Sequence, residues 1–328
     1  MMAPPRERPA SDAASLTVHE PVMLTETLAA LRVQPGGRYL DCTLGGGGHA
    51  EAILEASQPG GSLLGIDADP DALARTQRRL ARFGSAFMAA EGNFSDLEAI
   101  CDERGFKPVN GILFDLGLSS DQLASDRGFS FQQPSPLDMR FSPDQDKTAS
   151  DWVNDSSEED LANVIWQYGE ERQSRRIARA IVQRRPIATT LDLAKAVEQA
   201  VGRRPGSQSH PATKTFQALR IVVNQELASL INAMPRAHGL LGFGSSLVVI
   251  SYHSLEDRIV KQFMQRESRD CVCPPSQPVC TCGHKATLKP ITRGALQPSA
   301  AEVARNPRSR SAKLRAAERL SLDNGLAA

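Results

Sequence analysis

The sequence has little of several features that would assign it to a specialised class. Its six cysteines in 328 residues are too few for a disulfide scaffold, so a cytoplasmic protein in a reducing compartment is expected. No apolar run approaches the length of a membrane span, and we expect no membrane partner. The formal net charge is zero, which by itself suggests no nucleic-acid partner. The length predicts about two domains.

Several catalytic and targeting motifs are also missing. No G-x-x-x-x-G-K-[ST] string occurs, which argues against a triphosphate-binding P-loop. His253 and Ser254 are adjacent, but no G-x-S-x-G elbow accompanies them, which argues against acyl transfer. Residues 1–15 are rich in Pro, Ala and charge and lack the apolar core of a signal peptide. We therefore predict a disordered leader over residues 1–15.

The most informative stretch is a glycine-rich turn, DCTLGGGGH, at residues 41–49. An apolar run precedes it and a helical pattern follows, as at the entrance of a nucleotide site. Glycine lets the backbone turn at positive φ and approach a ligand closely, and the start of a helix offers free N–H groups. No third glycine completes G-x-G-x-x-G at the usual spacing. From these residues alone, a ligand-binding loop and a plain flexible turn both remain open.

Polar or aromatic residues follow the predicted strands, at the edge where open α/β sheets bind ligands. Asp67 comes about 20 residues after the glycine loop, where nucleotide folds keep a carboxylate for ribose hydroxyls. Asp69 precedes a proline and suits a helix cap, although the two acids could exchange roles. Phe94, by itself, is better explained as a core residue, and Asp115 ends the clearest strand. The predicted strands are residues 38–42, 61–66, 86–90 and 109–115.

The loop has the form D-x-x-x-G-x-G, which suits S-adenosylmethionine better than a dinucleotide, because this cofactor has a charged amino-acid end and no pyrophosphate. The sequence then resembles the MraW-type S-adenosylmethionine-dependent methyltransferases, the methyltransferase H family of the small ribosomal subunit. Ser135 stands where that family commonly has Gly, a departure confined to one turn. The matching strings are long and extend over nearly the whole chain, at residues 41–49, 65–70, 111–120, 127–131, 136–140, 168–172, 210–220, 251–258 and 306–315.

This resemblance implies an α/β fold, a Rossmann-like class I methyltransferase sheet with an inserted all-α domain. We expect the methyltransferase domain at residues 16–120 and 209–328, and an inserted lid and helical substrate-recognition domain at 121–208. The implied reaction transfers a methyl group from S-adenosyl-L-methionine to the N4 amine of a cytidine in the decoding region of 16S rRNA. No catalytic residue is assigned. The implied cofactor-binding residues are Gly47, Gly48, His49, Asp67, Phe94, Asp115 and Gln122.

Charge is segregated in the middle of the chain. Residues 121–160 contain ten acidic residues against three basic ones, and residues 172–220 contain eleven basic residues against two acidic ones. Helices are expected from residue 151 to 204, and their arginines could grip RNA phosphates or simply form a solvated face. The expected partner is 16S rRNA in the small ribosomal subunit. A homodimer is compatible with the sequence, which leaves the oligomeric state open.

Residues 121–150 show no sustained period and are typical of a lid or binding loop. Within this segment, Asp138 and Arg140 either contact the substrate or form an ion pair that holds the loop. A target base would have to be unpaired or flipped out of its helix to be reached. Our hypothesis is that the lid and the region around Asp138 hold that base.

The last third of the sequence predicts a helix at residues 216–231, a strand at 246–252 and a late strand within 306–319 whose arginines face RNA. Cys271, Cys273, Cys280 and Cys282 resemble a zinc site, but C-x-C is shorter than the usual spacing of two to four residues between paired cysteines. A reduced, cysteine-rich loop is the alternative, and no metal ligand is assigned.

Two functions of other classes remain open: an NAD-linked oxidoreductase on the same fold, and a non-catalytic RNA-binding assembly factor with an inactive cofactor pocket. Amino-methyltransferases often have Asn or Asp and two prolines after strand four, but residues 115–119 read DLGLS. The target atom therefore rests on the resemblance alone. Gly47→Val is expected to abolish cofactor binding and to leave the fold largely intact.

Overall fold

The computed structural model describes residues 21–203, 206 and 209–321. The predicted leader, residues 1–15, lies outside the described residues, as do the start of the predicted methyltransferase domain at 16–20 and its boundary at residue 208. Along the described residues, no helix combines the length and the apolar character needed to span a membrane.

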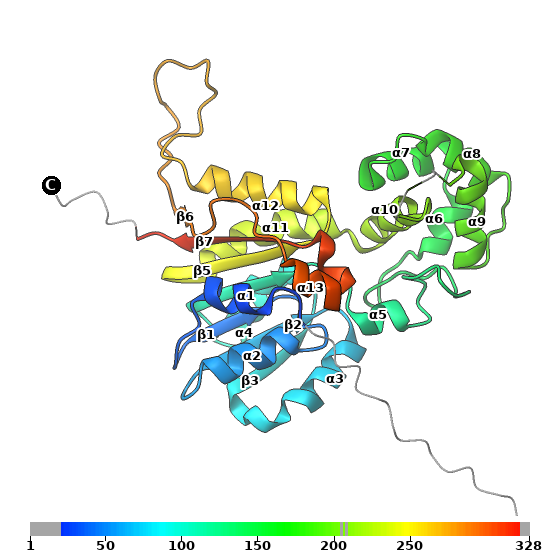
Figure 1. The fold of residues 1–328 in the computed structure, drawn as a ribbon. Helices are drawn as coiled ribbons and strands as arrows, with labels where there is room; N and C mark the ends of the chain where they lie inside the picture. Colours follow the sequence, from blue (N-terminus) through cyan, green and yellow to red (C-terminus); the bar gives the residue numbers. More distant parts are fainter. Residues whose placement is uncertain (1–20, 204–205, 207–208, 322–328) are drawn as a thin grey trace, which may run out of the picture.

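A seven-stranded sheet of order β3-β2-β1-β4-β5-β7-β6 forms the centre of the molecule (Figure 1). Strands β1 to β5 run parallel, and β7 is antiparallel to both β5 and β6. The strand order reverses between β1 and β4, which makes this point the expected ligand crevice. The Rossmann-like sheet is confirmed. Its strands are β1 Arg38–Asp41, β2 Ser62–Asp67, β3 Phe87–Glu91, β4 Val109–Asp115, β5 Leu241–Ser251, β6 Leu288–Pro290 and β7 Lys313–Arg319.

Successive residues of the inner strands point to opposite faces of the sheet, so each face carries an apolar cluster. Helices cover both of these clusters. Leu40 and Phe114 point toward the face covered by α4, α11 and α12, whereas Tyr39 and Leu113 point toward α1, α2 and α3. The central part of the sheet is therefore buried from both sides. These helices are α1 Leu24–Leu31, α2 Gly48–Ala56, α3 Pro70–Leu80, α4 Leu97–Glu103, α11 Glu226–Leu240 and α12 Ser254–Glu267.

Five further helices pack around an apolar cluster of their own, which includes Ile165, Ile177 and Val197. They appear in green to one side of the sheet in Figure 1. The existence of an all-α domain at residues 121–208 stays a prediction, and the shared cluster continues beyond that range to Val223. The helices are α6 Ala149–Asp155, α7 Glu158–Gly169, α8 Ser174–Val182, α9 Thr190–Val201 and α10 Thr213–Asn224, with the short α5 Ser120–Ala124 before them.

The predicted single helix at residues 216–231 is wrong. The chain forms two helices, α10 and α11, which meet at Gln225, where φ is 50°. An amphipathic pattern continues across this position, and a left-handed non-glycine residue leaves no clear sequence signal. Phe216 consequently packs in the helical cluster, whereas Leu230 packs against the sheet.

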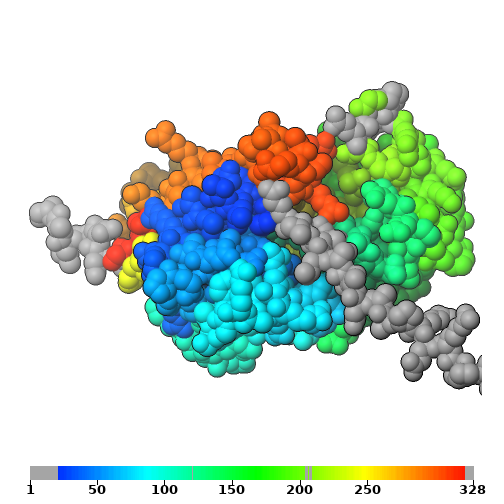
Figure 2. Space-filling model, turned by 60° about the horizontal axis from the view of Figure 1, so that its bottom comes forward, coloured from blue at the N-terminus to red at the C-terminus, as the bar shows by residue number. Residues whose placement is uncertain are grey.

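The C-terminal part of the chain fits into the sheet as predicted, but over a shorter range. A helix, α13 Ala300–Arg305, and a 3-10 turn, Pro307–Ser311, come before the strand β7. Strand β5 begins five residues before the predicted Ser246, because glycines at 242 and 244 and an exposed Phe243 hide the apolar pattern. Figure 2 shows the orange C-terminal segment against the blue N-terminal one, where Glu302 accepts a hydrogen bond from the backbone N–H of Met23 at 2.7 Å.

Candidate active site

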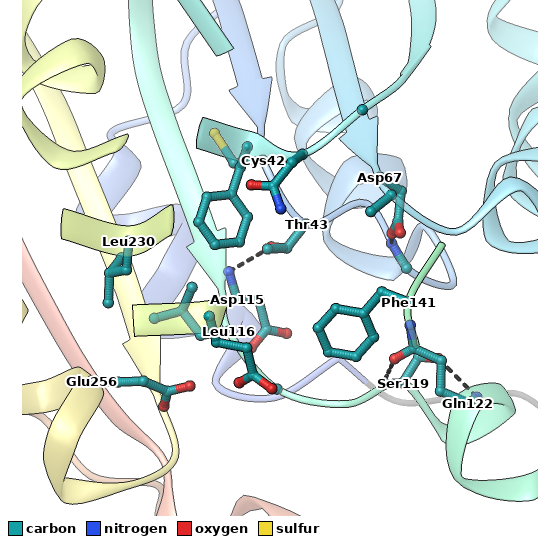
Figure 3. A pocket seen from close by; sticks show the side chains of 17 residues that line it. Cys42, Thr43, Asp67, Asp115, Leu116, Ser119, Gln122, Phe141, Leu230 and Glu256 are labelled. Carbon is teal, nitrogen blue, oxygen red and sulfur yellow. Dashed lines mark hydrogen bonds between the residues drawn. The ribbon is translucent and has the colours of Figure 1, made fainter. Parts of the chain in front are cut away.

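Two adjoining hollows lie at the carboxyl ends of β1, β2 and β4, where the strand order reverses. The first hollow extends from Asp67 and Phe94 to Glu226, and Figure 3 shows its labelled side chains converging from several elements. The second hollow lies between the glycine loop, His49 and Tyr252. The residues that line both are Thr43, Gly45, Asp115, Gly117 and Ser119, so these five form a shared wall.

The glycine loop is held in place by β2 and α3. The backbone N–H of Gly45 donates to the Asp67 carboxylate at 2.7 Å, and the Thr76 hydroxyl donates to the carbonyl of Gly45 at 2.7 Å. Gly47 caps α2 with φ 76°, and a Cβ added there would lie 2.6 Å from the Thr76 methyl carbon. Gly45, Gly46 and Gly48 line the hollows, whereas Gly47 lines neither of them. Gly47 therefore sets the backbone conformation of the loop without lining either hollow.

Asp67 and Asp69 have different surroundings in the structure. One Asp69 oxygen accepts a hydrogen bond from the backbone N–H of Asp71, so Asp69 caps α3 as predicted. Its other oxygen pairs with the guanidinium of Arg127. Asp67 instead faces the first hollow, and desolvation raises its pKa to about 6 although the N–H groups of Asp69 and Gly45 donate to it.

Phe94 packs against the core and also lines the first hollow. Its ring makes an edge-to-face contact with Phe114, with 5.6 Å between the centroids, and this places it against the core. The same side chain lines the first hollow together with Gly92 and Asn93. An aromatic residue at the end of β3 is therefore available to a flat ligand without losing its core contacts.

Asp115 lies in the wall that the two hollows share, and it contacts Thr43, Tyr252 and His49. Its backbone N–H donates to the Thr43 hydroxyl at 2.6 Å, and its Oδ1 accepts from the Tyr252 hydroxyl at 2.8 Å. His49 Nδ1 lies 3.5 Å from Asp115 Oδ2, and His49 Nε2 lies 3.0 Å from the Val22 carbonyl. Because a carbonyl can only accept, Nε2 carries a proton. Burial and the nearby Asp115 carboxylate raise the pKa of Tyr252 well above its ordinary value.

Gln122 lines the first hollow and is also part of a helix cap. Its Oε1 accepts from the backbone N–H of Ser119 at 3.0 Å, while the Ser119 hydroxyl accepts from the backbone N–H of Gln122 at 3.1 Å (Figure 3). This reciprocal pair starts α5. The side chain is buried, so the cap also fixes where the amide stands relative to the hollow.

The segment after α5 is attached to the sheet through Arg127. Besides pairing with Asp69, its guanidinium donates to the carbonyl of Phe141 at 3.1 Å, and Phe141 lines the first hollow. Arg140 forms two hydrogen bonds to Asp138, at 2.7 and 3.1 Å. This pair matches the ion-pair interpretation, and Asp138 does not line either hollow. The loop residue that does reach the first hollow is Phe141.

The chain has been compared with known protein families and with curated proteins. The model of the MraW methylase family matches residues 16–320. The chain belongs to the MraW methylase family. It is 58% identical over 303 residues to a ribosomal RNA small subunit methyltransferase H of Dehalococcoides mccartyi, covering 92% of this chain and 86% of the relative. A protein of the same name from Thermomicrobium roseum is 54% identical over 311 residues, covering 94% and 95%.

Membership of this family confirms the expected methyltransferase and its cofactor, S-adenosyl-L-methionine, and goes against an NAD-linked oxidoreductase. The residues of the MraW-family site fit such a group. Carboxylates at Asp67 and Asp115 suit hydroxyl donors and a positive sulfonium, and Phe94 offers an aromatic surface. A Cβ added at Gly46 would meet nothing within 4 Å, so the loop leaves open space where it borders the second hollow.

Most residues predicted for cofactor binding meet at this site. Gly48 and His49 line the second hollow, Asp67, Phe94 and Gln122 line the first, and Asp115 lines both. Their contact with the cofactor stays a prediction. Residues that sequence reasoning missed are Tyr252, Phe141 and Glu226, each brought in by a distant element. An acid such as Glu226 inside an amphipathic segment had no distinguishing signal.

Glu226 and Glu256 form the far wall of the first hollow, next to His253. Arg220 makes a two-pronged ion pair with Glu226, with distances of 2.8 and 2.9 Å. Burial still raises the pKa of the Glu226 carboxyl, although the Arg220 charge opposes that rise. His253 Nε2 lies 3.1 Å from Glu256 Oε1. The wall therefore combines two buried carboxylates with one neutralising guanidinium.

Proposed function

We propose that this methylase transfers the methyl group of S-adenosyl-L-methionine to the N4 amine of a cytidine in the decoding region of 16S rRNA, in the cytoplasm. The observation that carries the proposal is the pair of hollows joined at the wall of Thr43, Gly45, Asp115, Gly117 and Ser119. One hollow suits the adenosine half of the donor and the other suits its methionine half. Relatives named ribosomal RNA small subunit methyltransferase H support rRNA as the substrate.

The cofactor supplies an electrophilic methyl carbon on a sulfonium, so the chain has to bind, align and exclude water. In this assignment Asp67 accepts hydrogen bonds from ribose hydroxyls, and Phe94 packs against the adenine. His49 and the glycine loop border the methionine half. The Tyr252 hydroxyl and the Thr43 hydroxyl keep Asp115 at one position in the shared wall. No catalytic base is assigned.

A groove beside α7 supports contact with RNA. It is lined by Trp166, Glu170, Arg172 and Arg258, and 58% of the Trp166 surface is exposed. Arg258 donates to the Glu170 carboxylate at 2.9 Å, so Arg172 is the guanidinium of this groove that we assign to RNA. An exposed indole next to a guanidinium group can stack on unpaired bases and bind phosphates. Other arginines of the expected basic surface are used within the protein: Arg185 donates to the carbonyls of Val153 and Ser156.

The arginines of the tail are also engaged within the protein, contrary to the expectation that they face RNA. Arg315 pairs with Asp257 at 2.7 Å on the neighbouring helix. Arg319 donates to the carbonyl of Gly239 at 2.9 Å. Arg315 thus contacts α12, and Arg319 contacts the end of α11. We therefore assign RNA contact to the α7 groove and not to the tail strand.

The test is methyl transfer to small ribosomal subunits isolated from cells that lack this methylase. We expect labelled methyl groups in 16S rRNA and N4-methylcytidine as the modified nucleoside in mass analysis. A different methylated nucleoside would contradict the N4 assignment. Subunit binding without any methyl incorporation would indicate the non-catalytic assembly factor. Asp67→Ala serves as the cofactor-deficient control. Light scattering of the purified chain tests whether it forms a homodimer.

A further inference from the structure

Four cysteines come together in the long loop between α12 and β6, far from the hollows. Residues 268–287 form neither helix nor strand, and none of their side chains is buried. Figure 1 shows this loop extending away from the sheet. Its base is fixed where the Thr287 N–H donates to the Glu267 carbonyl at 2.8 Å. Beyond that base, no apolar cluster holds the loop, and Val279 is 69% exposed.

The four sulfur atoms nevertheless form a compact group. Their Sγ atoms all lie within 4.8 Å of one another, with 3.6 Å between Cys280 and Cys282 and 3.9 Å between Cys282 and Cys271. These distances are far too long for disulfide bonds, whose sulfurs are about 2.0 Å apart. Four thiolates around one zinc at Zn–S distances of about 2.3 Å are separated by ~3.8 Å in a regular tetrahedron. The observed separations bracket that value.

The surrounding groups favour four sulfur ligands. The backbone N–H of Val272 donates to the Cys282 sulfur at 3.4 Å, which helps to hold this sulfur within the group of four. His284, the nearest alternative ligand in the sequence, has its Nε2 3.1 Å from the carbonyl of Arg266. A structural metal is one of the ways in which a segment without an apolar core of its own becomes ordered.

We propose that Cys271, Cys273, Cys280 and Cys282 bind one structural zinc ion. The C-x-C spacing departs from the common zinc patterns, but the fold brings the two pairs face to face, and this compensates for the short spacing. Binding releases the thiol protons and closes the loop between residues 271 and 282. The ordered loop then presents the basic residues that flank it in sequence, Arg269 and Lys285, in one arrangement.

Metal analysis of the full-length protein tests this site. Protein from zinc-supplemented cells, dialysed in the presence of reductant, should contain about one zinc per chain by mass spectrometry. Cobalt substitution should give the intense visible bands of a tetrahedral thiolate site. Cys271→Ser and Cys282→Ser should each lose the metal. The matched control is Cys101→Ala, because Cys101 is buried in the core and should leave the zinc content unchanged.

A second measurement follows the loop directly. Removing zinc with a chelator should speed tryptic cleavage after Arg269 and Lys285 several-fold, while the thermal midpoint of the sheet stays the same. Wild-type protein without zinc above the buffer blank would overturn the proposal, as would cysteine variants that keep their zinc. Disulfides that persist under reductant would overturn it too. Zinc binding at this loop is independent of the RNA substrate. The methyl-transfer assay therefore neither supports nor contradicts the proposed zinc site.

Discussion

Gly46 and Gly47 are neighbours in the glycine loop, but a side chain added at each would meet different surroundings. Gly47 lies at φ 76° with its back against Thr76, so a side chain there strains the backbone and collides with α3. Gly46 has open space around it and borders the second hollow. The expectation that Gly47→Val leaves the fold largely intact is therefore not supported, and Gly46 is the better position for probing the cofactor.

We expect Gly47→Val to lower the free energy of unfolding by about 1–3 kcal/mol, from positive-φ strain and overpacking. Gly46→Ala should change stability by no more than about 0.5 kcal/mol, because it meets no neighbour. It should weaken S-adenosylmethionine binding several-fold, since its methyl group enters the hollow. Thermal unfolding and binding calorimetry on both variants separate the two effects. Equal stability loss in the two would contradict this distinction.

Asp67 should make cofactor binding depend on pH. Burial raises its pKa to about 6 from an ordinary value of 3.8, so the folded protein keeps a proton there that the unfolded chain has already lost. The contribution of Asp67 to stability therefore declines as pH rises from about 4 to 6. Ligand hydroxyls prefer the charged carboxylate, which forms above that range.

Affinity for S-adenosylmethionine is consequently expected to rise several-fold between pH 5 and 7 and then to level off. Calorimetric titrations across this range measure the change. Asp67→Asn should bind weakly at every pH, without the rise. If the variant kept the same pH profile as the native protein, another group would have to be responsible.

Local sequence patterns predicted the edge of the sheet but not the residues that come to it from a distance. Apolar runs that end at Asp67 and Asp115 identified two strand ends, and the Asp69-Pro70 pair identified the start of α3. The Tyr252–Asp115 hydrogen bond joins residues 137 positions apart. The break at Gln225 is equally invisible, because a left-handed turn between two apolar faces has no pattern of its own.

At the level of elements, Arg127 is one of several contacts that position the segment of residues 121–141, and it joins that segment to α3. Arg127 pairs with the fully buried Asp69 at the start of α3 and donates to the carbonyl of Phe141, which lines the first hollow. Removing the guanidinium leaves a buried carboxylate without its counter-charge. It also removes the hydrogen bond to the Phe141 carbonyl, although the Phe141 N–H still donates to Asn224. One residue thus has a stability effect and a binding effect that can be separated.

We expect Arg127→Ala to cost about 1–3 kcal/mol, less than a fully buried pair because the arginine is partly exposed. The double variant Arg127→Ala with Asp69→Asn should recover much of that stability, because Asn still caps α3 without a buried charge. Both variants should raise the KM for S-adenosylmethionine several-fold. Urea unfolding and methylation kinetics provide the two readouts. Recovery of both properties in the double variant would show that Arg127 does not position Phe141.

Across the described residues, the segments of residues 21–32 and 302–318 are fastened to each other, and both line the site. Pro21 and Val22 from the N-terminal side and Arg308 from the C-terminal side line the same hollow. The buried Glu302 carboxylate accepts a hydrogen bond from the Met23 backbone N–H, across 279 positions of sequence. A second link, from Arg32 on the N-terminal side to Glu318 on β7, lies at the surface.

These two links should differ in strength because only one is buried. Glu302→Ala leaves the Met23 N–H without a partner and should cost about 1–3 kcal/mol. Glu318→Ala removes an exposed ion pair and should cost at most about 1 kcal/mol. Urea unfolding midpoints compare the stability of the two variants. Calorimetry should show weaker cofactor binding for Glu302→Ala alone, because Glu302 holds Met23, and the preceding residue Val22 lines the second hollow. Equal midpoints for the two variants would mean that the buried link does not hold the N-terminal segment against the site.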